Sequence, residues 1–290
     1  MPEFPVDLPA DAKQAIVELG AVALQPYGAE QRHRSLRVLT SKDEVLWLKI
    51  DVADDLATVK REVAVLGALR DVPSVPRHVS SGYDGSWLLT TSVDGVQLAE
   101  LAPAAQRQAL PAVAAWLVAF RDRAASLPGF EVPDWDLFGR SCNLAAILEP
   151  ALAWWIEDVK PPLETDILLE TIRSHPPARG PVHGSFDPQN ILVGDDGTVG
   201  AVDFEAARPG LTSYDTAALL ARLSAQDPHL ANEWWQMTVG PGNPSEAAYV
   251  LGHLLLRTWY RHCAGVLVPE ALESLVSFLP TATNSLSYRN

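Results

Sequence analysis

The sequence is poor in cysteine and has no long apolar run. Its two cysteines, Cys142 and Cys263, lie far apart and outside any metal-ligand spacing, so we expect two free thiols in a reducing compartment. No apolar stretch reaches the roughly 20 residues needed to span a bilayer. The N-terminus, MPEFPVDLPADAKQ, carries acids and prolines where a signal peptide would need a basic start and an apolar segment. We therefore expect a soluble cytoplasmic protein.

Basic residues are also scarce. Lysine and arginine number 22 against 36 aspartates and glutamates, which gives a net charge of −14. Such a charge repels nucleic acids and anionic membranes and favours cationic small molecules. The hydrophobic fraction of 48% and the charged fraction of 20% are ordinary for a globular protein. We expect a small-molecule ligand, cationic or aromatic, and neither a nucleic-acid nor a membrane partner.

The first hundred residues combine helical and β-rich segments. Residues 10–20 have helical spacing with Gly20 as a stop signal, and a second helix is expected after Asp54 or Asp55. The β-rich runs between and after these helices are AVALQPY, SLRVLT, EVLWLKI and SWLLTTSV. This pattern predicts an N-terminal lobe over residues 1–100, made of an antiparallel sheet and a packed helix.

From about Pro103 the pattern becomes helical. Apolar spacing predicts one or two helices in PAAQRQALPAVAAWLVAFRDRAASL, and single helices in NLAAILEPALAWWIEDV, LETDILLETIRSH, SYDTAALLARLSA, PHLANEWWQMTV, SEAAYVLGHLLLRTWYRHCAG and PEALESLVSFL. Only residues 191–204 interrupt this pattern with strand character. The predicted fold class is therefore α+β, with a sheet-bearing lobe followed by a larger, mainly helical lobe over residues 101–290.

A predicted hairpin in the second lobe brings two polar residues together. The runs ILV and TVGAVDF are joined by GDDG, whose Asp196-Gly197 step favours a reverse turn. Asn190 precedes the first strand and Asp203 ends the second, so their side chains should be neighbours. An amide oxygen beside a carboxylate offers the hard oxygen ligands that Mg²⁺ prefers. Taken singly, each residue is better explained as a turn-capping Asn or a solvated Asp; the metal site is indicated by the two together, with HG at 183–184 ahead of them.

Lys49 and Glu62 form a second candidate pair. Lys49 lies on a predicted strand between apolar residues, and Glu62 lies in the helix that follows. A strand lysine held by a helix carboxylate can be presented to nucleotide phosphates. The alternative is a lysine that extends to solvent and a Glu62 that pairs locally with Lys60 or Arg61.

The order and spacing of these motifs resemble one known family. VHGSFDPQNIL followed by VDFE, with LKI and KREVAVLGAL upstream and SYDTAALL downstream, is similar to the aminoglycoside phosphotransferase and choline kinase-like family, which has a two-lobed protein-kinase-like fold. The resemblance implies that Lys49 contacts phosphate with Glu62 as its partner, and that Asn190 and Asp203 bind metal. The implied cofactors are Mg²⁺ and either ATP or GTP, if nucleotide binding is retained.

The resemblance also gives roles to neighbouring segments. It implies that His183 and Gly184 shape the catalytic loop, that Asp215 anchors this loop, and that WLLTTSV leads into the hinge where the nucleotide base binds. The loop that would cover the nucleotide, around YGAEQRHR, has Gly28 alone to let the backbone approach phosphate.

Ser185 departs from the family pattern, because it stands where the family has its catalytic aspartate. A serine hydroxyl orients an attacking hydroxyl weakly and is not a base at neutral pH. Losing a positioned base costs about 10² to 10⁴ in rate. Asp187 is the candidate substitute base, with loop bracing as its alternative role. Ser185 is not expected to be a covalent nucleophile, since HGSFD lacks the G-x-S-x-G elbow.

Tryptophan is abundant, with nine residues. Most should lie in the core, but neighbouring helix residues point about 100° apart, so one member of an adjacent pair can face a ligand. The substrate-binding candidates are Trp154, Trp155, Trp234, Trp235 and Glu157. Aromatic and acidic groups together suit a flat or cationic ligand.

Three functions fit the sequence. The first is a kinase-fold protein that binds a small molecule such as an antibiotic, giving self-resistance by sequestration, with phosphoryl transfer lost or vestigial because of Ser185. The second is an active ATP- or GTP-dependent kinase for a hydroxyl of an antibiotic or other small molecule. The third is a regulatory pseudokinase with a protein partner, which no sequence feature specifically favours. We favour the first.

Overall fold

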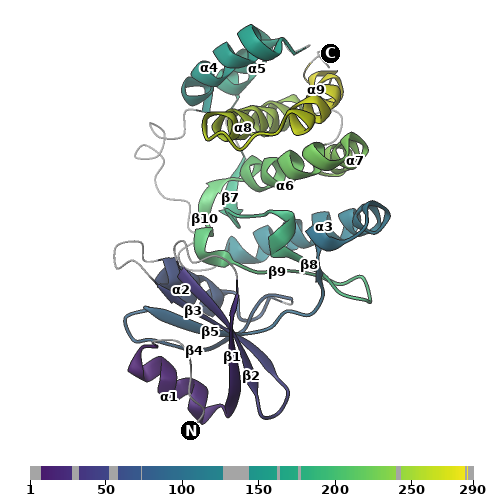
Figure 1. The fold of residues 1–290 in the computed structure, drawn as a ribbon. Helices are drawn as coiled ribbons and strands as arrows, with labels where there is room; N and C mark the ends of the chain where they lie inside the picture. Colours follow the sequence, from purple (N-terminus) through teal and green to yellow (C-terminus); the bar gives the residue numbers. More distant parts are fainter. Residues whose placement is uncertain are drawn as a thin grey trace.

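The chain folds into two lobes, which Figure 1 shows stacked end to end. The computed structural model describes residues 8–27, 33–51, 58–72, 74–126, 144–161, 164–175, 178–239, 243–284 and 286. The fold class is α+β, as the sequence predicts. The expectations for Gly28, for a helix cap at Asp54 or Asp55, and for Cys142 fall outside the described residues.

An antiparallel sheet forms most of the N-terminal lobe. Its strand order is β1-β2-β3-β5-β4, and the strands are β1 (Ala21–Tyr27), β2 (His33–Thr40), β3 (Val45–Asp51), β4 (His78–Ser81) and β5 (Trp87–Thr91). Side chains alternate between the two faces of a strand. In β3 the buried Leu48 packs in one cluster with Ile16 of α1 (Ala10–Glu18). Lys49 therefore points to the opposite face, which α2 (Thr58–Ala68) covers.

Seven long helices build most of the second lobe within the described ranges. They are α3 (Pro103–Ala124), α4 (Leu144–Trp154), α5 (Thr165–Ser174), α6 (Ser213–Gln226), α7 (Pro228–Thr238), α8 (Pro244–Cys263) and α9 (Pro269–Asn284). A π-helical turn, Trp155–Val159, extends α4. The side chains of Asp227 and Asn243 cap α7 and α8 by accepting hydrogen bonds from backbone N–H groups. The segment after Pro103 forms one helix, although it contains Pro111.

Short strands within the second lobe contradict one expectation. Strand character is not confined to residues 191–204, because β7 (Arg179–Val182) pairs antiparallel with β10 (Arg208–Leu211). The proline and glycine in RGPV and RPGL lower strand propensity and hide this pair in the sequence. In the predicted hairpin, β8 (Ile191–Val193) pairs with β9 (Val199–Ala201), and β6 (Val96–Gln97) adds to β8. The predicted lobe boundary at residue 100 thus follows a strand that pairs with the second lobe.

The apolar core does not divide at that boundary. The helix α2 contributes Val59 and Leu66, and Leu69 directly after it, to the same buried cluster that contains Phe120 of α3 and Phe204 after β9. A smaller cluster lies between α1 and the sheet. The helix α2 therefore fixes the position of the sheet relative to the helical lobe.

No helix in the described ranges combines enough length with enough apolar character to cross a bilayer.

Candidate functional site

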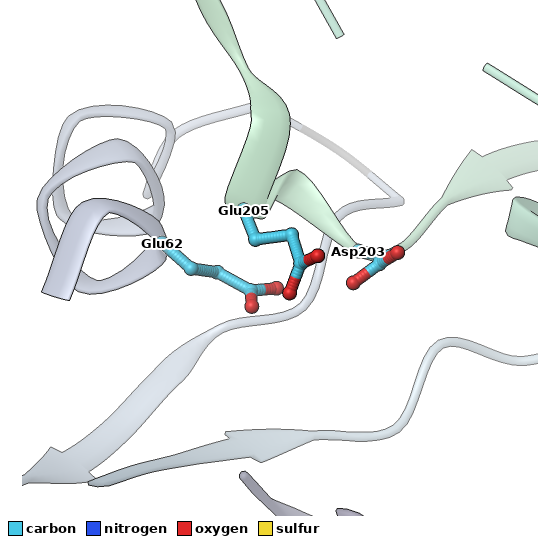
Figure 2. A group of neighbouring side chains, drawn as sticks. All are labelled: Glu62, Asp203 and Glu205. Carbon is cyan, nitrogen blue, oxygen red and sulfur yellow. The ribbon is translucent and has the colours of Figure 1, made fainter. Parts of the chain in front are cut away.

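Lys49 lies at the centre of a group of carboxylates where the two lobes meet. Its Nζ is 2.7 Å from Oε2 of Glu62 and also contacts Oδ1 of Asp203, while Oε2 of Glu205 is 3.8 Å away. Figure 2 shows these three carboxylates converging from α2 and from the segment after β9. The structure thus brings Lys49, Glu62 and Asp203 together. It adds Glu205, the second acid of the VDFE motif, to which sequence reasoning gave no role.

Burial makes the Lys49–Glu62 pair rigid. The side chains of Lys49 and Glu62 are 17% and 3% exposed. Burial alone would lower the pKa of Lys49, but the charges of Glu62 and Asp203 outweigh this effect and raise the pKa. The other oxygen of Glu62 accepts the N–H of Phe204 at 3.2 Å. Arg61 instead donates to the backbone carbonyl of Glu205 at 3.3 Å, so Glu62 is held by Lys49 and not by its sequence neighbours.

The donor set around Lys49 fits a divalent cation. Glu62, Asp203 and Glu205 offer oxygen atoms that all lie within 4.8 Å of one another. Three carboxylates opposite one ammonium leave an excess of two negative charges. Hard oxygen ligands and this charge excess are what Mg²⁺ requires.

Asn190 lies beside Asp203, as the hairpin predicts. Its Nδ2 is 3.5 Å from Oδ2 of Asp203, and it donates to the carbonyl oxygen and to Oγ of Ser185 at 2.9 and 3.1 Å. Asp203 has a φ of +69°, in the left-handed region that side chains other than glycine rarely adopt. Such a conformation costs about 1 to 3 kcal/mol and persists where the surroundings enforce it, often at functional sites.

Asp215 anchors the loop that carries Ser185. Its buried carboxylate accepts the backbone N–H groups of His183 and Gly184 at 2.8 and 2.9 Å. Gly184 has a φ of +80°, and a Cβ there would lie 2.3 Å from the carbonyl oxygen of Ala206. Only glycine therefore fits at position 184.

His183 fixes the backbone of Ser185 in turn. Its Nε2 lies 3.0 Å from the carbonyl oxygen of Val202, and its Nδ1 lies 3.3 Å from the N–H of Ser185. The first nitrogen must donate and the second must accept, which is the pattern of a neutral imidazole. Burial lowers the pKa of His183 and favours the same neutral form.

Asp187 is turned toward the helices of the second lobe. Its Oδ1 lies 3.5 Å from Nε of Arg222 on α6 and 3.7 Å from Nη2 of Arg257 on α8. This position between α6 and α8 suits a carboxylate that braces the loop. Sequence reasoning missed both arginines, because they come from helices distant in the chain.

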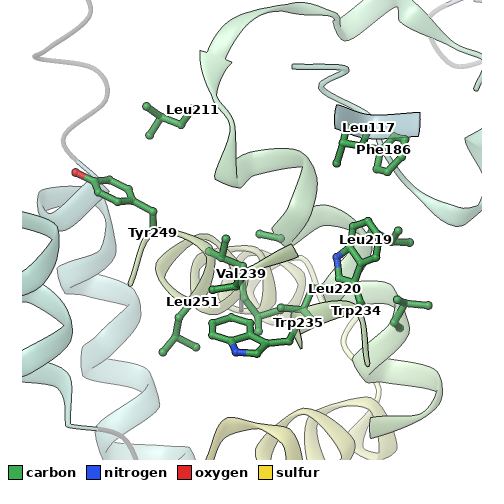
Figure 3. Packing of buried hydrophobic residues seen from close by; sticks show 14 of the residues in the cluster. Leu117, Phe186, Leu211, Leu219, Leu220, Trp234, Trp235, Val239, Tyr249 and Leu251 are labelled. Carbon is green, nitrogen blue, oxygen red and sulfur yellow. The ribbon is translucent and has the colours of Figure 1, made fainter. Parts of the chain in front are cut away.

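Three of the four candidate tryptophans are corrected by the structure. Trp234 and Trp235 are both fully buried because α7 contacts α3, α6 and α9, so opposite faces of the helix are covered; Figure 3 shows both within the core. Trp155 is also fully buried, and its indole N–H donates to the carbonyl of Leu255 at 3.2 Å. These three side chains therefore offer no surface to a ligand.

Trp154 is half-buried and lines a pocket of about 870 Å³. Its ring stacks on His262 with centroids 4.4 Å apart. The pocket is lined by Trp154, Asp158, Val159, His262, Leu272, Glu273, Val276 and Ser277. Glu157 is exposed and is not among these lining residues. Figure 1 places α4 and α9 at the end of the helical lobe farthest from the sheet, so this pocket is separate from the Lys49 group.

The chain belongs to the phosphotransferase enzyme family. The model of that family, APH, matches residues 23–249, a range that includes Lys49, Glu62, Ser185 and Asp203. Among curated proteins, none matches the sequence.

Solved structures of phosphotransferases share the fold. Choline kinase LicA from Streptococcus pneumoniae has a TM-score of 0.57 at 12% identity, over 96% of this chain and 98% of that chain. A thermostable mutant of aminoglycoside phosphotransferase APH(4)-Ia, in ternary complex with ADP and hygromycin B, has a TM-score of 0.59 at 17% identity, over 96% and 99% of the two chains. The streptomycin-ATP complex of APH(2")-IIa has a TM-score of 0.57 at 14% identity, over 97% and 99%. At such identities the likeness shows the fold alone.

Proposed function

We propose that this chain binds a magnesium nucleotide where its lobes meet, together with a small-molecule ligand, and that phosphoryl transfer is lost or vestigial. The observation that carries the proposal is the contrast within one site. Lys49 is held by Glu62 and Asp203 as a nucleotide site requires, whereas the residue beside Asn190 is Ser185. The ADP and ATP complexes of similar structures support the nucleotide.

Each charged residue has a definite task in this proposal. Lys49 donates to phosphate oxygens, and Glu62 keeps the ammonium in place. Asp203 and Asn190 hold Mg²⁺, and Glu205 stands next to them. When bound, the ion neutralises charge on the phosphates.

The missing base limits the chemistry. In transfer, the attacking hydroxyl oxygen forms a bond to the γ-phosphorus as the bond to the β-phosphate oxygen breaks, and the hydroxyl proton needs an acceptor. Ser185 is not a base at neutral pH, and Asp187 faces two guanidinium groups. Positioning and charge neutralisation carry much of phosphoryl transfer, so we expect a rate reduced by about 10² to 10⁴ and not abolished.

A separate observation supports sequestration. The pocket beside Trp154 combines stacked aromatic rings with Asp158 and Glu273, groups that suit an aromatic or cationic ligand such as an antibiotic. This ligand would be held away from Ser185 and would need no transfer. A Trp154→Phe variant should then lose most of the fluorescence response that a bound ligand produces.

Calorimetry with ATP and with GTP tests the proposal. We expect wild-type binding that requires Mg²⁺ and slow release of inorganic phosphate. Ser185→Asp should bind nucleotide equally and release phosphate about 10² to 10⁴ times faster. Ser185→Ala is the matched control, because it changes the same side chain without supplying a base.

Two outcomes would contradict the proposal. Wild-type turnover in the range of about 1 to 100 per second, typical of kinases, would show an active enzyme and favour the kinase alternative. Absence of nucleotide binding in both wild type and Ser185→Asp would remove the nucleotide site.

A further inference from the structure

The Ser185 loop is bordered by arginines beyond Asp187. Arg222 comes from α6, while Arg257 and Arg261 lie four residues apart on α8 and so share one face of that helix. Arg222 and Arg257 approach the same oxygen of Asp187. Arg261 lies one helical turn from Arg257, within electrostatic reach of Arg222, Asp187 and Arg257.

One carboxylate does not satisfy these three guanidinium groups. The contacts of Asp187 with Arg222 and Arg257, at 3.5 and 3.7 Å, are long beside the about 2.7 to 2.9 Å of a good charged hydrogen bond. The guanidinium of Arg261 makes no hydrogen bond or ion pair with any residue that the structure describes. Each guanidinium has five N–H donors. Donors therefore remain available, and the side chains of Arg222 and Arg257 are 38% and 25% exposed.

Positive charge dominates the side of the loop that faces α6 and α8, while the carboxylates of Asp203 and Asp215 contact other residues of the loop. Burial lowers the pKa of Arg261, and the neighbouring arginines lower it further. Arg208 and Arg257 both lie against the ring of Tyr214, at 5.4 and 5.3 Å from its centroid. In a protein with a net charge of −14, this local excess of positive charge lies beside the residue that replaces the family's catalytic aspartate.

We propose that a small molecule with an anionic group, a carboxylate or a phosphate ester, binds beside Ser185 through Arg222, Arg257 and Arg261, at a place distinct from the pocket beside Trp154. The inference rests on the proposed function, since it concerns the second ligand next to the nucleotide site. It departs from the cationic ligand expected from net charge, because the charge around this loop has the opposite sign. The competing role, in which the arginines only brace Asp187, requires no anion.

A matched set of small hydroxyl compounds tests this inference. Glycerol 3-phosphate, glycerate, glycerol and ethanolamine share a hydroxyl and differ in charge, and their binding is measured by calorimetry without nucleotide or Mg²⁺. We expect the two anions to bind and the neutral and cationic compounds not to bind. The relative affinity of glycerol 3-phosphate and glycerate shows whether the site prefers a phosphate ester or a carboxylate.

Arginine variants locate the binding. Arg257→Gln and Arg261→Gln should each weaken binding of the preferred anion about tenfold or more, while Arg257→Lys retains most of it. Arg107→Gln is the control, because Arg107 pairs with Glu233 at 2.8 Å in another part of the lobe. Adding ATP and Mg²⁺ should not displace the bound anion, which separates this site from the nucleotide site. Melting curves verify that each variant is folded. If Arg257→Gln does not fold, Arg261→Gln tests the inference in its place.

The inference is overturned if glycerol 3-phosphate and glycerate bind no better than glycerol. It is equally overturned if folded Arg257→Gln and Arg261→Gln bind the anions as wild type does, or if ATP with Mg²⁺ displaces the anions. A chain that binds the anions through these arginines but binds no nucleotide would refute the proposed nucleotide site and leave the arginine site standing.

Discussion

The two ends of the site carry opposite excess charge. Around Lys49, three carboxylates face one ammonium, whereas around Asp187 the guanidinium groups outnumber the one carboxylate. The first arrangement suits a metal ion with phosphates, and the second suits an anion. The difference indicates that Ser185 lies between two groups of charged side chains of opposite sign, so the substitution at this position does not coincide with a loss of charged residues around it.

Removal of Lys49 should have the largest effect. Lys49→Met leaves the buried carboxylate of Glu62 without its cation, which costs about 3 to 5 kcal/mol of unfolding free energy and abolishes nucleotide binding. Urea denaturation and calorimetry measure the two effects. Lys60→Met is the control, since Lys60 is an exposed lysine on α2, the helix that carries Glu62. Unchanged stability in Lys49→Met would mean that the ion pair does not define this end of the site.

The pH dependence of the unfolding free energy tests the environment of His253, which lies near Arg257. Nε2 of His253 is buried without a hydrogen-bond partner among the described residues, and burial, assisted by Arg257, lowers the pKa of His253 to about 4. Because the folded pKa is depressed, stability is full above the unfolded pKa of about 6.5 and falls as pH drops toward 4. The loss from this group is on the order of 3 kcal/mol.

Urea denaturation across this pH range measures the loss. His253→Phe removes the titration and should flatten the curve, while His183, whose pKa is also lowered, keeps a residual slope. Equal slopes in wild type and His253→Phe would contradict a positive, dry environment beside Arg257.

The anchor between the two ends should have an intermediate effect. Asp215→Asn keeps the shape of the side chain but replaces one of the two oxygens that accept the N–H groups of His183 and Gly184. Leaving one buried donor unsatisfied costs about 1 to 3 kcal/mol. Faster hydrogen exchange at Gly184, with little change in the helices, would confirm a local anchor. A uniform increase across the chain would instead show global destabilisation.

Substitution of Glu205 should have the smallest effect on stability, and it should selectively weaken Mg²⁺ binding. Glu205→Gln reduces the negative excess around Lys49 from two charges to one and keeps the size of the side chain. We expect the Mg²⁺ concentration needed for nucleotide binding to rise about three- to tenfold, with nucleotide affinity at saturating Mg²⁺ nearly unchanged. An unchanged Mg²⁺ requirement would exclude Glu205 from the metal site.

Local periodicity predicts the part of the site that local structure builds. The alternation of β3 orients Lys49, a helix presents Glu62, and a tight hairpin brings Asn190 to Asp203. These relations depend on strands, turns and helices whose signals lie within short windows. The order of these motifs along the chain then reveals the family resemblance, and the resemblance assigns a role to each residue.

The features of the site that the sequence does not predict depend on packing between residues far apart in the chain. Arg222 meets Asp187 across 35 residues because α6 passes the loop, and no window of sequence contains both. The burial of Trp234 and Trp235 depends in the same way on helices that cover both sides of α7. The net charge of −14 averages over the surface and says nothing of the sign at one loop.

The shared position of α2 has a consequence for how the molecule unfolds. Because Val59, Leu66 and Leu69 belong to the core of the helical lobe, the boundary seen in shape is not a boundary in folding. The two lobes should melt in a single cooperative transition, with α1 and its smaller cluster as the region able to open first. Because both lobes share this core, we expect the contacts of Lys49 to be lost in the same transition that unfolds the rest of the chain.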